Sequence, residues 1–277
     1  MQTQWCCQGA RPVVPGRPFG IMGIVNTSPD SFYQDTASGL TKALRLRAEG
    51  ATILDLGGES TRPGSRGISP EEECHRLLPV LSALRAQAHG TLLSVDTWHA
   101  STAATVLRLG VDIINDVSAA SWDPALVDVL VQFKPGYVLM HALGRPETMQ
   151  VSPHYENVVD EVLHFFETQM QRLVSAGLPE NRIILDPGIG FGKTLKHNLD
   201  LLTHIQRIST LGRPLLIGIS MKQVFGDLLG LPVEQRCQAT QIATALLFAQ
   251  GVLWHRVHHV AETVQTLTLA SHLRMQI

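Results

Sequence analysis

Seven short apolar runs in this chain of 277 residues each lead into a polar residue of a type that binds ligands or reacts. Six of the runs lead into Asn26, Asp55, Asp96, Asn115, Asp186 and Lys222, and the seventh carries Arg256 and leads into His258. A parallel barrel produces such a pattern, because every strand delivers its last residues to one shared mouth. The sequence therefore predicts a single site built from the ends of several strands.

Acidic and amide side chains form the first group of candidates, and they are Asp55, Asp96, Asn115, Asp116 and Asp186. Any one of them alone is as readily explained as a turn former or a helix cap. Gathered on one rim, they could present hydrogen-bond acceptors and donors to a flat, nitrogen-rich heterocycle. Such a site would discriminate strongly, since an unmatched buried polar group costs about 1–3 kcal/mol.

Cationic side chains form the second group, which contains Arg62, Lys222, Arg256 and His258. Arg256 and His258 alternate along one predicted strand, so their side chains point to the same face. Such a pair suits a phosphate or pyrophosphate, which an arginine can grip with two parallel hydrogen bonds. A surface arginine and a histidine with ordinary structural partners are the alternative interpretation.

A glycine-rich segment, residues 186–194, ends in Gly-Lys-Thr as a nucleotide-binding P-loop does. A P-loop also needs a glycine five positions before Gly192, and that position is Pro187. The spacing therefore excludes a P-loop. The alternating glycines instead predict a backbone that approaches a bound ring closely.

Short aliphatic runs alternate with longer amphipathic stretches, which is typical of a parallel sheet with crossover helices. The predicted strands are Gly20–Val25, Thr52–Leu56, Leu92–Val95, Asp112–Asn115, Tyr137–Met140, Arg182–Leu185, Leu215–Ile219 and Leu253–Val257. Right-handed crossovers make either an open doubly wound sheet or a closed barrel, and eight strands favour closure. The predicted fold class is α/β, a (β/α)8 TIM barrel.

Helix-start signals support this segmentation. Ser69–Glu72 (SPEE) predicts a capping box, in which Ser69 caps the helix and Glu72 reaches back. Asp123 and Pro124 predict the start of a helix that runs to about Gln132. Helical periodicity extends over residues 155–176, and Gly177 is placed to end that helix.

Length and composition indicate one barrel domain over residues 18–277, preceded by a leader of residues 1–17, since such barrels need roughly 250 residues. Hydrophobic residues make up 44% of the chain, which is enough for a large core. The net charge of −2 gives no electrostatic footprint for nucleic acid or an anionic membrane. The four cysteines show neither a CxxC pair nor zinc-site spacing, so we expect reduced thiols. No apolar stretch of the sequence is long enough to span a bilayer. Together these features predict a cytoplasmic protein.

An ordered set of motifs resembles the dihydropteroate synthase family over roughly residues 19–275. The motifs are Asn26–Phe32 (NTSPDSF), Gly57–Pro63 (GGESTRP), Ser94–Thr97 (SVDT), Ile114–Val117 (INDV), Tyr137–His141 (YVLMH), Thr148–Gln150 (TMQ), Asp186–Thr194 (DPGIGFGKT), Ser220–Lys222 (SMK) and Arg256–His258 (RVH). Any one motif would be weak, but the ordered set is highly specific.

This resemblance implies a transferase of folate biosynthesis. It would condense 6-hydroxymethyl-7,8-dihydropterin pyrophosphate with p-aminobenzoate to give 7,8-dihydropteroate and pyrophosphate. The implied pterin site consists of Asp96, Asn115, Met140, Asp186, Phe191 and Lys222. The implied pyrophosphate site consists of Asn26, Arg256 and His258, with Mg²⁺ near Asn26. The implied aminobenzoate site is framed by Phe32, Thr61, Arg62, Pro63 and Ser220.

Catalysis would depend on Asp96, Asp186, Lys222, Arg256 and His258. The resemblance also implies a homodimer formed through the last helices, with small-molecule substrates and neither nucleic acid nor membrane as a partner.

Departures from the family pattern lie mainly beside the expected second-substrate site. Met221 and Gln223 flank Lys222 where the family usually has Arg and Ser, and His259 stands where Asp is usual. One alternative is therefore a catalytically weak paralogue that binds the pterin pyrophosphate but handles aminobenzoate poorly. Another is the pterin-binding domain of a cobalamin-linked methyltransferase, against which the Arg256/His258 pair and residues 60–63 argue.

Overall fold

A computed structural model describes residues 4–27, 36–60, 64–65, 67–88 and 90–274. Eight parallel strands form the central sheet: β3 (Gly20–Asn26), β4 (Ile53–Gly57), β5 (Leu92–Asp96), β6 (Ile113–Asp116), β7 (Gly136–Met140), β8 (Ile183–Asp186), β9 (Leu216–Ile217) and β10 (Trp254–Val257). The order across the sheet is β8-β7-β6-β5-β4-β3-β10-β9, and a bridge between Leu185 and Leu215 joins its two edges. The predicted TIM barrel is confirmed.

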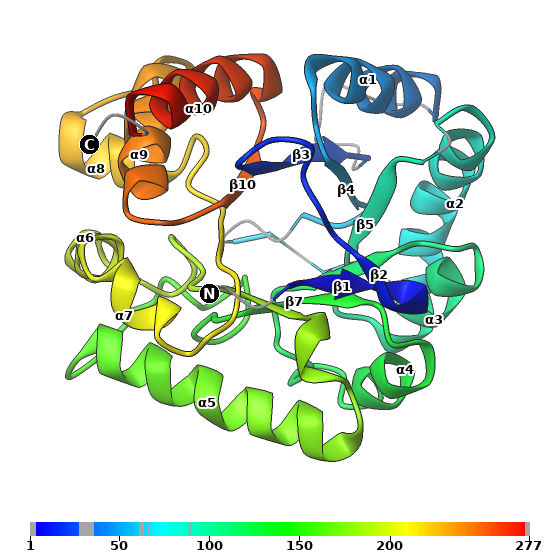
Figure 1. Ribbon diagram of the computed structural model, residues 1–277. Coiled ribbons are helices and arrows are strands. Elements are labelled where there is room, and N and C mark those ends of the chain that lie inside the picture. The colour runs from blue at the N-terminus through cyan, green and yellow to red at the C-terminus, as the bar shows by residue number, and fades with distance from the viewer. Residues whose placement is uncertain (1–3, 28–35, 61–63, 66, 89, 275–277) are drawn as a thin grey trace.

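Helices surround these strands (Figure 1). They are α1 (Thr36–Glu49), α2 (Pro70–Gln87), α3 (Ala100–Arg108), α4 (Leu126–Phe133), α5 (Val158–Ala176), α6 (Leu195–Thr203), α7 (Ile205–Ser209), α8 (Gln223–Leu229), α9 (Cys237–Ala249) and α10 (Val260–Arg274). Among the described residues, short 3-10 helices lie at Gln8–Ala10, Glu180–Arg182 and Val233–Gln235. Within the described residues, no helix is both long enough and apolar enough to cross a membrane.

The strand bounds agree with the predicted ones to within about one residue, except at β9. That strand has two residues, whereas Leu215–Ile219 is the predicted range. Leu215 contributes only the closing bridge, and the chain turns at Ile219, whose carbonyl accepts a hydrogen bond from the Lys222 backbone N–H at 3.2 Å. The turn ends the strand early and brings Lys222 back toward the barrel mouth.

The predicted capping box at α2 is only half formed. Ser69 caps the helix, because its hydroxyl accepts the Glu72 backbone N–H at 3.3 Å, and Pro70 is the first helical residue. The Glu72 carboxylate does not complete the box. It accepts instead from Arg76 Nε at 2.8 Å, one helical turn further along.

Asp123 serves the start of the predicted helix and also the start of α3. Its Oδ1 accepts the backbone N–H of Ala125 at 3.2 Å, in the turn that leads into α4. Helix α4 begins only at Leu126, and the Asp123 carboxylate accepts the backbone N–H of Ala100 at 2.8 Å, at the start of α3. Helix α5 begins at Val158, after an Asn157 cap. Gly177 ends it with a φ of 114°, as the sequence predicted.

The N-terminal segment covers the end of the barrel opposite the mouth. A short hairpin, β1 (Cys6–Cys7) and β2 (Arg11–Pro12), brings Trp5 and neighbouring apolar residues against the first residues of the barrel strands. The Trp5 ring meets the Trp254 ring edge to face at 5.4 Å, and its Nε1 donates to the Arg182 carbonyl at 2.8 Å. A Cβ at Gly20 would lie 2.2 Å from the Trp254 ring, so only glycine fits there. This packing closes the end of the barrel at which the strands begin. The end at which the strands finish is left open to ligands.

Candidate active site

A cavity opens at the carboxyl ends of the barrel strands. Its lining residues come from β5 through β10 and the loops that follow them, and they are Asp96, Asn115, Val117, Met140, Asp186, Gly188, Ile189, Phe191, Gly218, Lys222 and Arg256. All six residues of the implied pterin site are in this set. The shared mouth predicted from the polar strand ends is therefore present.

The sheet register explains why these side chains meet. Asp96 is the last residue of β5 and lies beside Asn115 of β6. Met140 is the last residue of β7 and lies beside Asp186, the last residue of β8. Paired positions on adjacent parallel strands project their side chains to the same side, so the four converge inside the barrel.

Arg256 joins two carboxylates beneath the cavity. Its Nε donates to Asp55 Oδ2 and its Nη2 donates to Asp96 Oδ2, both at 2.7 Å. Asp55 is fully buried on β4, and its Oδ2 also accepts from Asn115 Nδ2 at 3.0 Å. The arginine predicted for a pyrophosphate is therefore also the residue that orients Asp96.

Burial dominates the electrostatics of the cavity. It raises the pKa of Asp96 to about 7; Arg256 opposes this effect and Asp55 adds to it. Burial also raises the pKa of Asp186, although the backbone N–H of Gly188 donates to that carboxylate at 2.8 Å. The pKa of Arg256 is lowered by burial, but Asp55 and Asp96 outweigh this effect and raise it, so the guanidinium stays charged. Two carboxylates, Asp96 and Asp186, thus line the cavity and can accept from a ligand rich in N–H donors. Arg256, Lys222 and Lys193 lie close enough to Asp186 to favour its ionised form.

Lys222 and Phe191 form one wall of the cavity. The Lys222 ammonium lies 3.9 Å from the centroid of the Phe191 ring, which is a cation–π contact. Met221, just before Lys222, has a φ of 61°, a left-handed conformation that is unusual for a side chain of this size. Its backbone N–H donates to Thr240 Oγ1 at 3.1 Å, and its carbonyl accepts from Arg236 Nη1 at 3.3 Å. These bonds hold the turn that presents Lys222.

The glycine-rich loop forms the adjoining wall, and its lysine points inward rather than toward a phosphate. Lys193 is buried, and its ammonium donates to the carbonyls of His141, Gly188 and Phe191 at 3.0–3.3 Å. A Cβ on Gly188, whose φ is 66°, would lie 1.9 Å from the His141 carbonyl oxygen. The close approach that Gly188 allows is therefore to the chain's own backbone.

His258, Ser220 and Asn26 lie outside the residues that line the cavity. The Ser220 hydroxyl accepts the His258 backbone N–H at 3.2 Å and lies 3.1 Å from His258 Nδ1. Asn26 ends β3, beside Gly57 of β4. The structure pairs His258 with Ser220 and Arg256 with carboxylates, rather than placing Arg256 and His258 together in the cavity.

Four residues of the implied aminobenzoate site, Phe32, Thr61, Arg62 and Pro63, lie outside the described residues. Three lining residues were not predicted: Val117, Ile189 and Gly218. A signal did exist for Val117, because it follows Asn115 by two positions and strand alternation places such residues on one face.

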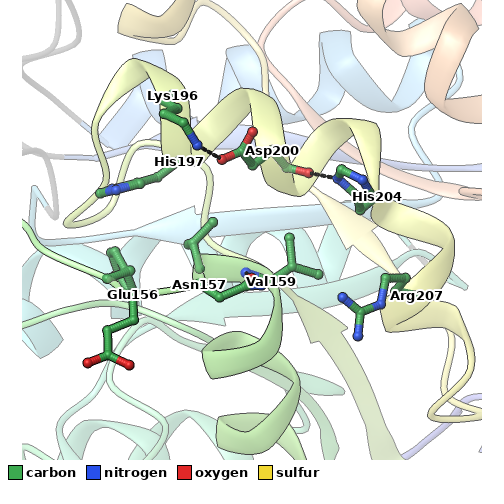
Figure 2. A pocket seen from close by; sticks show the side chains of 10 residues that line it. Glu156, Asn157, Val159, Lys196, His197, Asp200, His204 and Arg207 are labelled. Atoms are coloured by element: carbon green, nitrogen blue, oxygen red, sulfur yellow. Dashed lines mark hydrogen bonds and ion pairs between the residues drawn. The ribbon is translucent and has the colours of Figure 1, made fainter.

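A larger cavity lies outside the barrel, between the start of α5 and helices α6 and α7 (Figure 2). Its polar side chains are largely engaged with one another. Lys196 pairs with Asp200 at 2.6 Å, His204 Nδ1 lies 2.9 Å from the Asp200 carbonyl, and Arg207 pairs with Asp160 at 2.8 Å. The Lys196 side chain is 82% exposed, so we interpret this cavity as a solvated groove between helices.

Comparisons with known proteins agree with the cavity chemistry. The family model for pterin binding enzymes matches residues 22–258. The dihydropteroate synthase of Haemophilus influenzae is 39% identical, with 89% of this chain and 91% of that protein covered. The Escherichia coli synthase is 38% identical, with 89% of each chain covered.

Two solved structures extend the comparison to the fold. The Yersinia pestis dihydropteroate synthase, in a sulfonamide complex, superposes with a TM-score of 0.91 at 36% identity, over 97% of this chain and 98% of that one. The Burkholderia cenocepacia synthase, complexed with 7,8-dihydropteroate, gives a TM-score of 0.89 at 35% identity, over 99% and 97% of the two chains. The chain therefore belongs to the dihydropteroate synthase family of pterin-binding transferases.

Proposed function

We propose that this chain condenses 6-hydroxymethyl-7,8-dihydropterin pyrophosphate with p-aminobenzoate, giving 7,8-dihydropteroate and pyrophosphate. The observation that carries this proposal is one cavity in which two carboxylates, the largely buried Asp96 and the buried Asp186, meet the Asn115 amide and the Lys222 ammonium. The carboxylates accept the N–H groups of a pterin, while Lys222 donates to its acceptor atoms. Met140 and Phe191 supply apolar surface for the ring faces.

Reaction at this site separates charge. Breaking the bond between the pterin methylene carbon and the pyrophosphate oxygen leaves a cation on the pterin and an anion on the leaving group. Asp96 and Asp186 stabilise the cation, and Arg256 with His258 stabilises the anion as it develops. The aminobenzoate nitrogen then bonds to the methylene carbon and loses a proton.

Asn26 could hold a magnesium ion beside the pyrophosphate. Asn26, at the end of β3, offers an amide oxygen, a ligand type that Mg²⁺ accepts. One protein oxygen suits an ion that completes its shell with pyrophosphate oxygens and water. When bound, Mg²⁺ would supply positive charge next to the leaving group.

Affinity for the pterin is expected to rise as the pH increases through about 7, where Asp96 loses its proton. Below that pH the neutral acid carries no charge to pair with ring N–H groups, and above it both oxygens accept. Titration calorimetry with the pterin pyrophosphate, from one pH unit below this value to one above, measures the effect. Asp96→Asn should bind weakly at every pH, and a pH-independent affinity in the unmodified protein would contradict the role given to Asp96.

A weak pterin-binding paralogue is the second candidate, and Met221 is the observation that favours it. This residue occupies a left-handed turn between Ser220 and Lys222, and methionine cannot supply the charge of an arginine. Calorimetry combined with a pyrophosphate-release assay separates the candidates. Tight pterin binding without pyrophosphate release would favour the paralogue.

Growth of a bacterial strain that lacks its own synthase tests the proposed function in cells. We expect this chain to restore growth without added folate products, because rescue requires both substrates to be used together. An Asp186→Asn variant is the matched control and should not rescue. Failure of the unmodified chain, when expressed and folded, would argue against the reaction, as would methyl transfer from methyltetrahydrofolate by the purified protein.

We also propose that the chain forms a homodimer through α9 and α10, which pack side by side (Figure 1). Ile242 and Leu246 lie one turn apart on α9 and are 56% and 61% exposed. Leu269 and Leu273 are similarly placed on α10, at 63% and 58%. Large exposed apolar side chains on two adjacent helices are of the kind that mediates association, and we name these four residues the α9–α10 patch.

Substitution at this patch is expected to yield monomers. Leu246→Glu would place a charge in the interface, whereas Val174→Glu on α5 serves as a control at a distant exposed position. Analytical ultracentrifugation measures the mass of each. A monomeric unmodified protein, or a dimer that survives Leu246→Glu, would contradict the assignment of this interface.

We propose a cytoplasmic location because the cysteines are free thiols. All four, Cys6, Cys7, Cys74 and Cys237, are free thiols. Free thiols persist most readily in a reducing compartment. Cell fractionation of the native host would test this location.

A further inference from the structure

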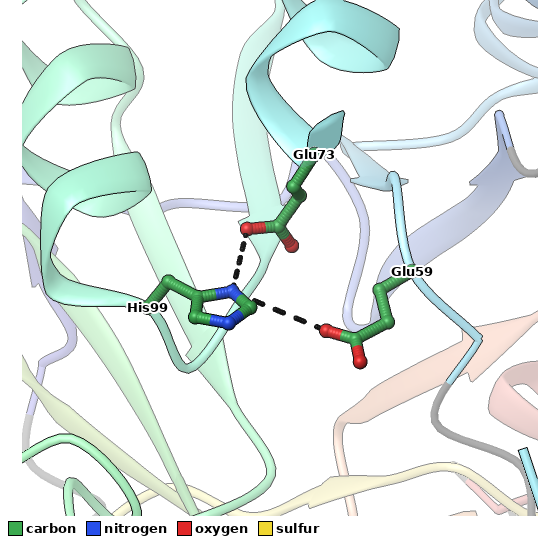
Figure 3. Close-up of side chains that lie close together, drawn as sticks. All are labelled: Glu59, Glu73 and His99. Atoms are coloured by element: carbon green, nitrogen blue, oxygen red, sulfur yellow. Dashed lines mark hydrogen bonds and ion pairs between the residues drawn. The ribbon is translucent and has the colours of Figure 1, made fainter. Parts of the chain in front are cut away.

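Three acid and imidazole side chains converge at the rim of the barrel, outside the cavity (Figure 3). Glu59 lies in the loop after β4, Glu73 in the first turn of α2, and His99 just before α3. His99 Nδ1 lies 3.1 Å from Glu73 Oε2 and 4.0 Å from Glu59 Oε2. One ligand-type atom from each residue lies within 4.8 Å of the other two. We call these residues the Glu–Glu–His cluster.

Burial makes the charge of this cluster costly. The side chains of Glu59 and His99 are each 7% exposed, and that of Glu73 is fully buried. When both carboxylates are ionised they carry −2, and a protonated His99 would reduce this only to −1. Buried charge without compensation is strongly unfavourable. A positively charged partner would therefore stabilise the cluster.

The groups outside the cluster that donate hydrogen bonds to the Glu59 and Glu73 carboxylates are neutral. Thr97 Oγ1 donates to Glu73 Oε2 at 2.8 Å, and Trp98 Nε1 donates to Glu59 Oε2 at 3.1 Å. The backbone N–H of Ile68 donates to Glu59 Oε1 at 3.3 Å. Within the part of the chain that the structure describes, neither carboxylate has an ion pair with a lysine or arginine. These bonds orient the carboxylates without cancelling their charge.

One oxygen of the cluster stands out. Glu73 Oε1 is buried and has no hydrogen-bond partner among the described residues. Leaving a buried acceptor unsatisfied costs about 1–3 kcal/mol, and more for a charged group. An orphaned carboxylate oxygen beside a second carboxylate and an imidazole is the state expected of a ligand set without its ion.

We propose that Glu59, Glu73 and His99 bind a divalent transition-metal ion, with Zn²⁺ the preferred probe. Protein ligands lie about 2.0–2.2 Å from zinc, so the ligand atoms lie within roughly 4.4 Å of one another. The 3.1 and 4.0 Å separations between His99 Nδ1 and the carboxylates meet this requirement, and all three ligand-type atoms lie within 4.8 Å of one another, so a small side-chain adjustment completes the set. An ion of charge +2 with a neutral His99 neutralises the cluster completely.

The mixed ligand set also indicates which metals are preferred. Imidazole nitrogen suits Zn²⁺ and similar transition ions, whereas Mg²⁺ prefers oxygen ligands alone. The bound ion would tie the loop after β4 to the starts of α2 and α3. This site is separate from the Mg²⁺ expected near Asn26, and it does not depend on the proposed reaction.

Metal titration of the chelator-treated full chain, without substrate, tests the proposal. We expect one tightly bound Zn²⁺ at this site per chain, a raised thermal midpoint on binding, and little response to Mg²⁺. Glu73→Gln and His99→Gln should each weaken Zn²⁺ binding at least tenfold, since even partners of metal ligands contribute about 10- to 100-fold. Glu72→Gln is the matched control, because that carboxylate lies on the same turn but pairs with Arg76.

Cobalt substitution reports on the ligand types, even if a variant fails to fold. Co²⁺ bound to the unmodified protein should show a visible spectrum without a thiolate charge-transfer band, which separates this site from binding at Cys74. The proposal is overturned if the unmodified chain binds no stoichiometric Zn²⁺, if a thiolate band appears, or if folded Glu73→Gln and His99→Gln bind as tightly as Glu72→Gln.

Discussion

Replacing Arg256 with glutamine is expected to abolish turnover and to lower the free energy of unfolding by about 3–5 kcal/mol. The guanidinium donates to Asp55 and Asp96 at 2.7 Å each. Asp55 is fully buried, so glutamine would leave its carboxylate without its cation in a low-dielectric interior. Chemical denaturation and steady-state kinetics measure the two effects on the same variant.

Two further variants separate the role of charge from that of shape. Arg256→Lys keeps the charge but loses the fork that reaches both carboxylates, so we expect intermediate losses. Arg207→Gln removes a guanidinium that is 51% exposed and pairs with Asp160, and should cost under about 1 kcal/mol with unchanged activity. An Arg256→Gln protein with the stability and turnover of Arg207→Gln would contradict the role of the buried network.

Replacing Lys222 with methionine is expected to reduce kcat/KM for the pterin pyrophosphate by roughly 10- to 150-fold. A hydrogen bond from a charged donor contributes about 1.5–3 kcal/mol, and each 1.4 kcal/mol is a factor of ten. Lys222 borders the cavity and lies over the Phe191 ring, where its ammonium can donate to a ring-bound acceptor. Methionine keeps most of the side-chain volume, so the loss should appear in binding rather than in stability.

The matched control is Lys196→Met, which removes a lysine that is 82% exposed on α6. We expect its pterin affinity to equal that of the unmodified protein. Calorimetry shows whether the Lys222→Met loss lies in binding, and equal affinity in the two variants would mean that Lys222 does not contact the pterin.

The fold could be predicted from the sequence because its signals are local and repeat along the chain. Each strand is an apolar run that ends in a polar residue, and parallel strands deliver those ends to one mouth. The same regularity placed Asp96, Asn115 and Asp186 in a common cavity. The early end of β9 was not predicted, because the apolar run continues to Ile219 while the turn to Lys222 depends on backbone hydrogen bonds.

Side-chain partners were harder to predict, because they join residues far apart in the chain. A strand position shows which way Arg256 points but not that Asp55, 201 residues away, accepts from it. The need for glycine at position 188 likewise comes from the carbonyl of His141. No spacing rule relates Glu59, Glu73 and His99, whose convergence depends on how α2 and α3 pack beside the barrel rim.

Chromatographic detection of 7,8-dihydropteroate made by the purified chain tests the proposed reaction most directly. With the pterin pyrophosphate, p-aminobenzoate and Mg²⁺ supplied together, we expect dihydropteroate and pyrophosphate in equal amounts, and no dihydropteroate when either substrate is omitted. Folded protein that binds the pterin pyrophosphate but forms no dihydropteroate under these conditions would contradict the assignment of this cavity as a synthase active site.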